Sequence, residues 1–392
     1  MTTLLLYIAF LLCVETVVVV GLWWAHLRFW QNRLQVPLPY ASVEELAMPD
    51  GGTIELRRIG VDVAAGPAGD STPVPVLLIH GLAMNHRNHD ANEGSSFARF
   101  LRDQGRDVWL LTLRSGRYNR SPLGHPRSDF AAMVQHDLPR AVAEVLARTG
   151  QPQLDLGGFS MGGMLIYASL ARTLDSRLVR RVAIFAAPAK LRPLGVMGMW
   201  HWLPRSLTPT VRTRLLMRSF AFFPRLVPSF LWRRVYNPKN VESHVERRML
   251  WNVWADIPGR LGSDFMRWSK NGGTLTVDGV PVLAGLAHVS TPVCFYAGAI
   301  DWLAPVDTVR AGYDAWGSDV PGVHKHFVVL GRDSGTVDDY GHCDISFGRH
   351  VTAEVFEPAA RFLGTAELRA PSAAQLDPAR EQPTGATQRS LA

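Results

Sequence analysis

The residue best placed for covalent chemistry is Ser160, which lies in the pattern Gly-x-Ser-x-Gly at residues 158–162. A β-strand is expected over residues 153–158 and a helix over residues 161–172. A serine on such a sharp turn holds its hydroxyl above the edge of a sheet, and its small neighbours let strand and helix approach closely. The backbone N–H of Met161 is then suited to stabilise a developing oxyanion. The spacing predicts a serine nucleophile.

Strands and helices alternate along the chain on both sides of this turn. The strands are near-continuous apolar runs, which are typical of a parallel sheet covered by helices on both faces. A hairpin around residues 50–52 precedes them. The pattern predicts an α/β fold with a mostly parallel sheet. The expected strands are residues 74–79, 107–113, 153–158, 179–185, 291–297 and 323–330, and the expected helices are residues 95–104, 130–148, 161–172, 305–316 and 351–363.

Two further residues follow expected strands in the order that a catalytic triad requires. Asp301 comes after the strand that ends at residue 297, and His342 lies in the loop after the strand that ends at residue 330. His342 would accept the proton of Ser160, and Asp301 would hold the imidazole in the needed tautomer. Asp338 and Asp339 are alternative acids because they lie close to His342 in sequence.

At this point the sequence resembles the α/β-hydrolase superfamily over about residues 41–364. Residues 108–117, 137–139 and 342–344 resemble the acid-lipase branch, whereas residues 272–282 and 301–305 are similar to the polyhydroxyalkanoate synthase branch. The resemblance implies acyl transfer through a covalent acyl-enzyme, with Ser160, Asp301 and His342 as the triad. The synthases carry Cys as the nucleophile, and a Ser ester is usually resolved by water, so Ser160 favours hydrolysis.

In this superfamily the loop after the first parallel strand supplies a second oxyanion donor. Here residues 75–79 are followed by His80, Gly81 and Leu82, so the backbone N–H of Leu82 is the expected donor. We interpret His80 as a structural residue that braces this loop. His86, Asn88, His89 and Asp90 follow, and we favour helix or loop capping by this group over a metal site. No metal and no cofactor is expected.

The alternation stops after residue 189, and an insertion of residues 190–285 follows. Between Lys190 and Lys270 there are fifteen Lys and Arg against four Asp and Glu, and six of the twelve Trp residues. Interleaved basic and aromatic residues fit an anionic membrane surface or a lid, and no nucleic-acid-binding motif accompanies them. We therefore expect a helical cap that forms an apolar acyl-binding wall and contacts the membrane, and no binding of nucleic acid.

The N-terminus predicts a membrane anchor. Residues 4–25 are apolar apart from Glu15, and about 20 such residues cross a hydrocarbon core. A cleaved signal peptide is the competing interpretation, but no basic residue precedes the run and no small-x-small cleavage site follows it. Arg28 and Arg33 follow the span, so the positive-inside rule places the body of the protein in the cytoplasm.

Composition sets the remaining limits. With 47% hydrophobic and 19% charged residues the chain is not a disordered protein, and its three cysteines exclude a disulfide scaffold. We divide the chain into an anchor helix (1–30), a first core part (41–189), the cap (190–285), a second core part (286–365) and a disordered tail (366–392).

Together these features predict a membrane-anchored serine hydrolase that cleaves carboxylic esters with hydrophobic acyl chains. Two alternatives remain open. The first is an acyltransferase or polyester synthase that uses acyl thioesters, for which the basic cap would hold an anionic carrier. The second is a catalytically idle scaffold on the same fold.

Overall fold

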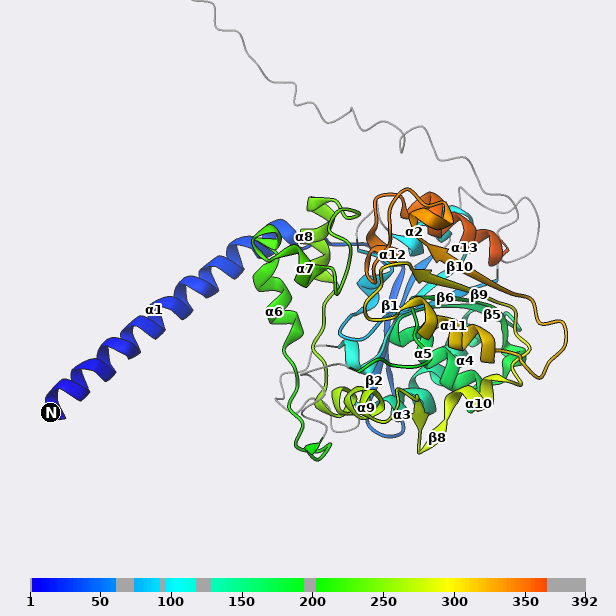
Figure 1. Ribbon diagram of the computed structural model, residues 1–392, viewed down its shortest axis with the longest axis horizontal. Helices are drawn as coiled ribbons and strands as arrows, with labels where there is room; N and C mark the ends of the chain where they lie inside the picture. The colour runs from blue at the N-terminus through cyan, green and yellow to red at the C-terminus, as the bar shows by residue number, and fades with distance from the viewer. Residues whose placement is uncertain (1, 61–73, 92–95, 118–127, 194–201, 365–392) are drawn as a thin grey trace, which may run out of the picture.

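The computed structural model describes residues 2–60, 74–91, 96–117, 128–193 and 202–364 (Figure 1). Its centre is an eight-stranded sheet in the order β1-β2-β4-β3-β5-β6-β9-β10. The pairs β1/β2 and β2/β4 are antiparallel, and all the other pairs are parallel. The predicted α/β fold with a mostly parallel sheet is confirmed. The strands are β1 (Ser42–Ala47), β2 (Thr53–Gly60), β3 (Val76–Ile79), β4 (Val108–Thr112), β5 (Leu154–Phe159), β6 (Val179–Phe185), β9 (Val293–Gly298) and β10 (Lys325–Leu330).

Burial follows the apolar content of the strands. Every residue of β3, β4, β5 and β9 is buried, whereas the residues of β1 alternate between half-buried and exposed. Central parallel strands are covered on both faces and therefore read as continuous apolar runs, while an antiparallel edge strand keeps one face in solvent. The central strands form a rigid platform, and the residues at their carboxyl ends are positioned by it.

Helices cover both faces of the sheet (Figure 1). One face is covered by α2 and α13, and the ring of Phe97 on α2 lies 5.1 Å, between centroids, from that of Phe356, the residue just before α13. The other face is covered by α4, α5 and α11. The helices of the core are α2 (Phe97–Asp103), α3 (Phe130–Ala132), α4 (Leu138–Thr149), α5 (Met161–Leu170), α11 (Val306–Ala315), α12 (Asp344–Phe347) and α13 (Glu357–Phe362).

The helix predicted over residues 130–148 is not regular throughout. A π-helical turn, Met133–Asp137, separates α3 from α4. Pro139 follows it and has no N–H to donate to the carbonyl of the preceding turn, so the ladder widens there. The side chain of Asp137, the last residue of this turn, forms an ion pair with Arg114 at 2.6 Å.

The segment between β6 and β9 is mainly helical. It also contains a small hairpin of two-residue strands, which the sequence pattern did not predict. Residues 194–201 at its start and the predicted tail, residues 366–392, lie outside the described residues, and the boundaries proposed for the cap and the two core parts stay predictions. Its elements are α6 (Thr213–Phe220), α7 (Ser229–Trp232), α8 (Ser243–Asn252), α9 (Gly259–Lys270), β7 (Thr276–Val277), β8 (Val280–Pro281) and α10 (Val282–Leu286).

The N-terminal helix α1 (Thr2–Leu34) projects away from the body of the molecule (Figure 1). Among the described residues, α1 is the one helix that is both long enough and apolar enough to cross a membrane, over Leu4–Leu34. Its last turns contact the insertion: the ring of His26 lies 4.0 Å from that of Phe222 between centroids. Asn252 at the end of α8 donates to the carbonyl oxygen of Leu34 at 2.7 Å. The helix therefore leaves the body beside α6 and α8.

Candidate active site

Ser160 lies on a strained turn between β5 and α5. Its φ of 52° and ψ of −118° fall in a region that L-residues rarely adopt. The turn needs glycine at position 162 because a Cβ there would lie 2.3 Å from the carbonyl oxygen of Ile79. The backbone N–H of Ser160 donates to the carbonyl of Phe185 at 2.8 Å, which fixes the turn to β6. The side chain is half-buried, so its hydroxyl stays accessible at the sheet edge.

The structure brings the other two predicted residues to this hydroxyl. His342 Nε2 lies 2.9 Å from Ser160 Oγ, and His342 Nδ1 lies 2.7 Å from Asp301 Oδ2. Asp301 and His342 are each 4% exposed, so both groups face one another away from bulk water. With Nδ1–H donating to the carboxylate, Nε2 presents a lone pair toward the serine hydroxyl. Nucleophile, base and orienting acid thus form one continuous hydrogen-bonded chain.

The carboxylate of Asp301 is held on both sides. Its Oδ1 accepts the backbone N–H groups of Leu303 and Ala304, both at 2.8 Å, which leaves Oδ2 for His342. The alternative acids point elsewhere: Asp338 pairs with Arg332 at 2.7 Å, and Asp339 Oδ1 accepts the Arg332 N–H at 2.9 Å. The geometry favours Asp301 as the partner of the imidazole.

The loop after β3 packs directly on the serine turn. A Cβ at Gly81 would lie 3.2 Å from that of Ser160, and Ala83 adopts a left-handed φ of 57°. Among the described residues, neither the Leu82 N–H nor the Met161 N–H donates a hydrogen bond. The two amides therefore have the availability that oxyanion donors require.

His80 braces this loop as the sequence predicted. Its Nδ1–H donates to the carbonyl of Gly81 at 2.8 Å, and its Nε2 accepts the Leu113 N–H at 3.1 Å. Complete burial lowers the pKa of His80 to about 4, so the ring is neutral near pH 7 and suits one donor and one acceptor. This histidine is occupied by backbone contacts and does not reach the serine.

The polar residues that follow this loop, 86–90, make contacts that hold the backbone and neighbouring side chains in place. His89 Nε2 donates to the Ile79 carbonyl at 3.0 Å, and Asp90 forms an ion pair with Arg99 at 2.8 Å. No cluster of three potential metal ligands occurs in the part of the chain that the structure describes. Asn88 has a role that the sequence did not reveal: its Oδ1 accepts the N–H of Gly81 at 3.1 Å and so orients the loop that carries Leu82.

The insertion is hydrogen-bonded to the same loop. The Ala255 N–H donates to the Ala83 carbonyl at 2.7 Å, and the Asn85 N–H donates to the Val253 carbonyl at 3.0 Å. Met84 and Trp254 form an antiparallel bridge between these contacts. The helical insertion and the predicted oxyanion loop are therefore one connected unit, although about 170 residues separate them in sequence.

Comparison with known proteins settles the family of this fold. Residues 74–335, well over half of the chain, match the family model described as alpha/beta hydrolase fold. The chain belongs to the α/β-hydrolase family. Sterol esterase 2 of Saccharomyces cerevisiae is 29% identical over 229 residues, which are 48% of this chain and 43% of that protein. Lipase member K of Homo sapiens is 32% identical over 213 residues, 51% of each chain.

This α/β-hydrolase therefore spans about half the length of the curated relatives it matches. Among solved structures, a soluble variant of monoglyceride lipase from Saccharomyces cerevisiae aligns with a TM-score of 0.53 and 17% identity, over 84% of this chain and 96% of that one. An esterase from Thermogutta terrifontis aligns with a TM-score of 0.51 and 17% identity, over 82% and 98%. At these identities the structures show the shared fold alone. The likeness to polyhydroxyalkanoate synthases stays a prediction.

A second residue that sequence reasoning left without a role is Asp344, which ties the His342 loop of this hydrolase to the insertion. Its Oδ1 accepts the Asn237 N–H at 3.1 Å. Its Oδ2 accepts the Gly341 N–H and the Asn240 side-chain amide, both at 3.0 Å. Because both oxygens accept from N–H groups, the contacts favour the ionised carboxylate, whereas complete burial opposes it and raises its pKa from 3.8 to about 6.

This pKa predicts how stability depends on pH. Since the folded protein retains the Asp344 proton at pH values where the unfolded chain has lost it, the free energy of unfolding falls as the pH rises from about 4 to about 6. The loss from this group is about 2 to 3 kcal/mol. In Asp344→Asn, which cannot titrate, the stability relative to the parent should rise by that amount between pH 4 and pH 7. Denaturant unfolding of the full chain in detergent measures it.

The control for this prediction is Asp333→Asn, because Asp333 is an exposed carboxylate on the segment that leads to the same loop. Its stability relative to the parent should stay constant over the same pH range. A constant difference for Asp344→Asn as well would show that Asp344 does not titrate near pH 6 in the folded protein.

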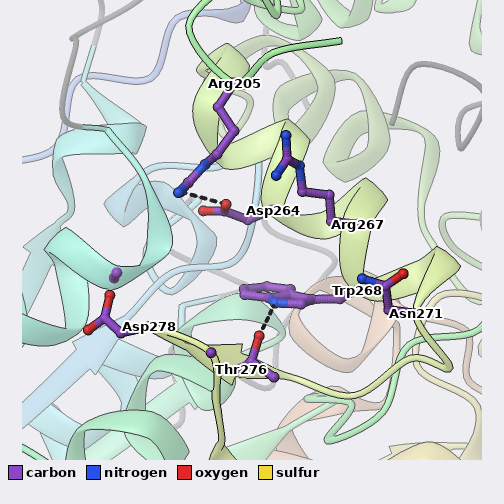
Figure 2. A pocket seen from close by; sticks show the side chains of 9 residues that line it. Arg205, Asp264, Arg267, Trp268, Asn271, Thr276 and Asp278 are labelled. Atoms are coloured by element: carbon purple, nitrogen blue, oxygen red, sulfur yellow. Dashed lines mark hydrogen bonds and ion pairs between the residues drawn. The ribbon is translucent and has the colours of Figure 1, made fainter. Parts of the chain in front are cut away.

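A cavity of about 270 Å³ lies apart from these residues, beside α9 (Figure 2). Figure 2 shows Arg205 and Asp264 pointing toward one another across it, at 2.6 Å, while Trp268 donates to Thr276 at 3.1 Å. Asp264 also accepts the Phe130 N–H at 3.1 Å. The lining includes none of the three candidate catalytic residues and neither candidate oxyanion amide. The contacts of Asp264 tie the insertion to α3.

Proposed function

We propose that the protein is a membrane-anchored serine hydrolase that cleaves carboxylic esters with hydrophobic acyl chains. The observation that carries the proposal is the hydrogen-bonded chain from Ser160 Oγ through His342 to Asp301, with distances of 2.9 and 2.7 Å. A hydroxyl, an imidazole and a buried carboxylate in this order are the groups that acyl transfer requires. The named lipases and sterol esterase among the relatives support the same reaction class.

The geometry supports a two-step reaction. Ser160 Oγ attacks the ester carbonyl while its proton passes to His342 Nε2, and Asp301 stabilises the resulting imidazolium. The oxyanion receives the N–H groups of Leu82 and Met161. His342 then returns the proton to the departing alcohol, which leaves an acyl-enzyme on Ser160. Water, deprotonated by the same imidazole, releases the carboxylic acid and restores the serine.

The insertion supports a hydrophobic substrate and a membrane location. From the end of α6 through α7 it exposes large apolar side chains, among them Leu226 at 76% and Phe230 at 63%. Arginines, including Arg225 and Arg233, are interspersed with them. Apolar side chains beside basic ones suit the interface of an anionic bilayer. The end of α1 contacts this part of the insertion, and Arg28 and Arg33 after its apolar run support a cytoplasmic body.

Labelling with a fluorophosphonate tests nucleophile and anchor together. The reagent reacts only with a serine that its surroundings activate. In fractionated cells that express the full chain we expect labelling on Ser160, in the membrane pellet and at the mass of the uncleaved chain. Nitrophenyl esters of increasing chain length then define the acyl preference. An unlabelled chain would exclude the hydrolase, and a shortened, soluble labelled chain would exclude the anchor.

A further inference from the structure

A second cavity, of about 370 Å³, lies between the insertion and the predicted oxyanion loop. Five parts of the chain form its walls: β2, the segment after the oxyanion loop, residues 112–117 from the end of β4 onward, α6, and residues 252–256 from the end of α8 onward. Asn85 is three residues after Leu82. The cavity therefore adjoins the site described above through one short loop, yet none of the triad residues lines it.

The cavity is strongly basic. Four arginines line it, against two carboxylates, Glu55 and Asp256. Both carboxylates already have partners: Glu55 pairs with Arg57 at 2.5 Å, and Asp256 pairs with Arg212 at 2.9 Å. The lining arginines are Arg57, Arg117, Arg214 and Arg218. Arg57 is thus compensated by Glu55, and Arg117 pairs with Glu45, so the surplus of positive charge at the cavity wall centres on Arg218.

The side chain of Arg218 is bound by the backbone and by an aromatic ring, and Asp256 influences its charge only from a distance. Arg218 Nε donates to the Trp251 carbonyl at 3.0 Å and its guanidinium lies 4.8 Å from the Trp251 ring centroid. No carboxylate in the described part of the chain forms an ion pair with it. Arg214 precedes it by one helical turn, a spacing at which like charges repel. Burial and this neighbour lower the pKa of Arg218 to about 10, which still leaves it charged at neutral pH.

Neutral donors complete the wall. The indole Nε1 of Trp254 is buried and has no hydrogen-bond partner in the described part of the structure. Thr112 contributes a hydroxyl that lies 3.0 Å from His86 Nδ1. A buried N–H without a partner is costly unless a ligand accepts from it. Guanidinium forks together with such donors match the several oxygens of one tetrahedral oxyanion.

From these contacts we infer that this cavity binds a phosphate group, with Arg218 as its main ligand, and that the phosphate belongs to a lipid headgroup. The lipid source rests on the proposed function and on α6 itself. On this helix Arg214 and Arg218 line the cavity, whereas Leu215 and Leu216 are 50% and 48% exposed. A headgroup in the cavity would place its lipid beside these leucines and next to the loop that carries Leu82.

The experiment uses the full chain with Ser160→Ala in non-ionic detergent, so that no turnover consumes the ligand. Binding of lysophosphatidylglycerol is compared with that of the monoacylglycerol of equal chain length, which lacks only the phosphate-bearing part. We expect the phosphate to tighten binding at least tenfold, and Arg218→Gln to remove most of that difference because a hydrogen bond to a charged group is lost. Arg192→Gln, an exposed arginine of the insertion that lies outside the cavity, is the matched control.

A second measurement needs no cavity variant. Sodium phosphate should raise the Tm of the full chain above its value in sodium chloride of equal ionic strength, because a ligand of the folded state stabilises it. If phosphate displaces the lysolipid, the result supports binding of a lipid headgroup in this cavity. If phosphate binds through Arg218 without displacing the lysolipid, the site binds free phosphate instead. The proposed phosphate site would be wrong if the Tm were equal in both salts, or if Arg218→Gln left the affinities for both lipids unchanged. Ester turnover by the parent protein is measured separately, so loss of one proposal does not imply loss of the other.

Discussion

Replacing Ser160 by alanine is expected to lower kcat on nitrophenyl esters by about 10⁴- to 10⁶-fold. The variant loses the only atom that can form the acyl-enzyme, and the neighbouring amides of Leu82 and Met161 retain just the residual catalysis of an oxyanion hole. The fold should survive, because alanine keeps the Cβ and the backbone N–H of residue 160 still reaches the Phe185 carbonyl. Steady-state hydrolysis and the pre-steady-state burst of nitrophenol measure the effect.

Ser169→Ala is the matched control for this change. Ser169 lies on the same helix, α5, is fully buried, and its hydroxyl has no hydrogen-bond partner among the described residues. The control should keep its burst and its kcat within about a few-fold of the parent. If Ser160→Ala turned esters over at the parental rate, the activity would belong to another group and the hydrolase proposal would fail.

Asp301→Asn is expected to lower kcat by about 10⁴-fold with little change in stability. The two backbone donors on Oδ1, from Leu303 and Ala304, decide how the new amide is oriented. They require its oxygen on their side, so its NH₂ group faces His342 Nδ1 and donates to it. That nitrogen must then lack its proton, and Nε2 carries the proton instead. An imidazole that presents N–H to Ser160 cannot accept the hydroxyl proton.

The pH profile of kcat/KM and a surface control make this test specific. Asp314→Asn removes an exposed carboxylate from α11, the helix that follows Asp301, and should leave the profile unchanged. Loss of activity confined to Asp301→Asn supports the tautomer argument. A fully active Asp301→Asn would instead indicate that Asp338 or Asp339 orients the imidazole, despite their contacts with Arg332.

The three candidate triad residues could be placed from the sequence because each follows a predicted strand. The carboxyl ends of parallel strands meet at one edge of a sheet, so Ser160 after β5, Asp301 after β9 and His342 after β10 converge without knowledge of tertiary contacts. The glycine pattern around Ser160 added a local steric reason. The composition of the strands was similarly informative, since the central strands are mostly apolar.

The contacts that hold these residues in place could not be read in this way. Asp344 depends on Asn237 and Asn240, which reach it from the insertion, and nothing in the local pattern around residue 237 indicates that pairing. Asn88 likewise accepts the N–H of Gly81, and nothing in the sequence distinguishes Asn88 from the polar residues beside it. The π-helical turn before Pro139 was missed because the apolar periodicity of residues 130–148 continues through it.

In the proposed membrane-anchored arrangement, the attachment of α1 also fixes how deep the molecule sits in the bilayer. About 22 residues at 1.5 Å each already reach across the roughly 30 Å hydrocarbon layer, so the lipid can accommodate the helix only up to about residue 25. The following turn carries His26, whose ring meets that of Phe222 edge to face. Phe223, half exposed beside it, is consequently held at headgroup depth. A substrate drawn from that leaflet would thus need to move only a short way sideways, without first dissolving in water, to meet the enzyme.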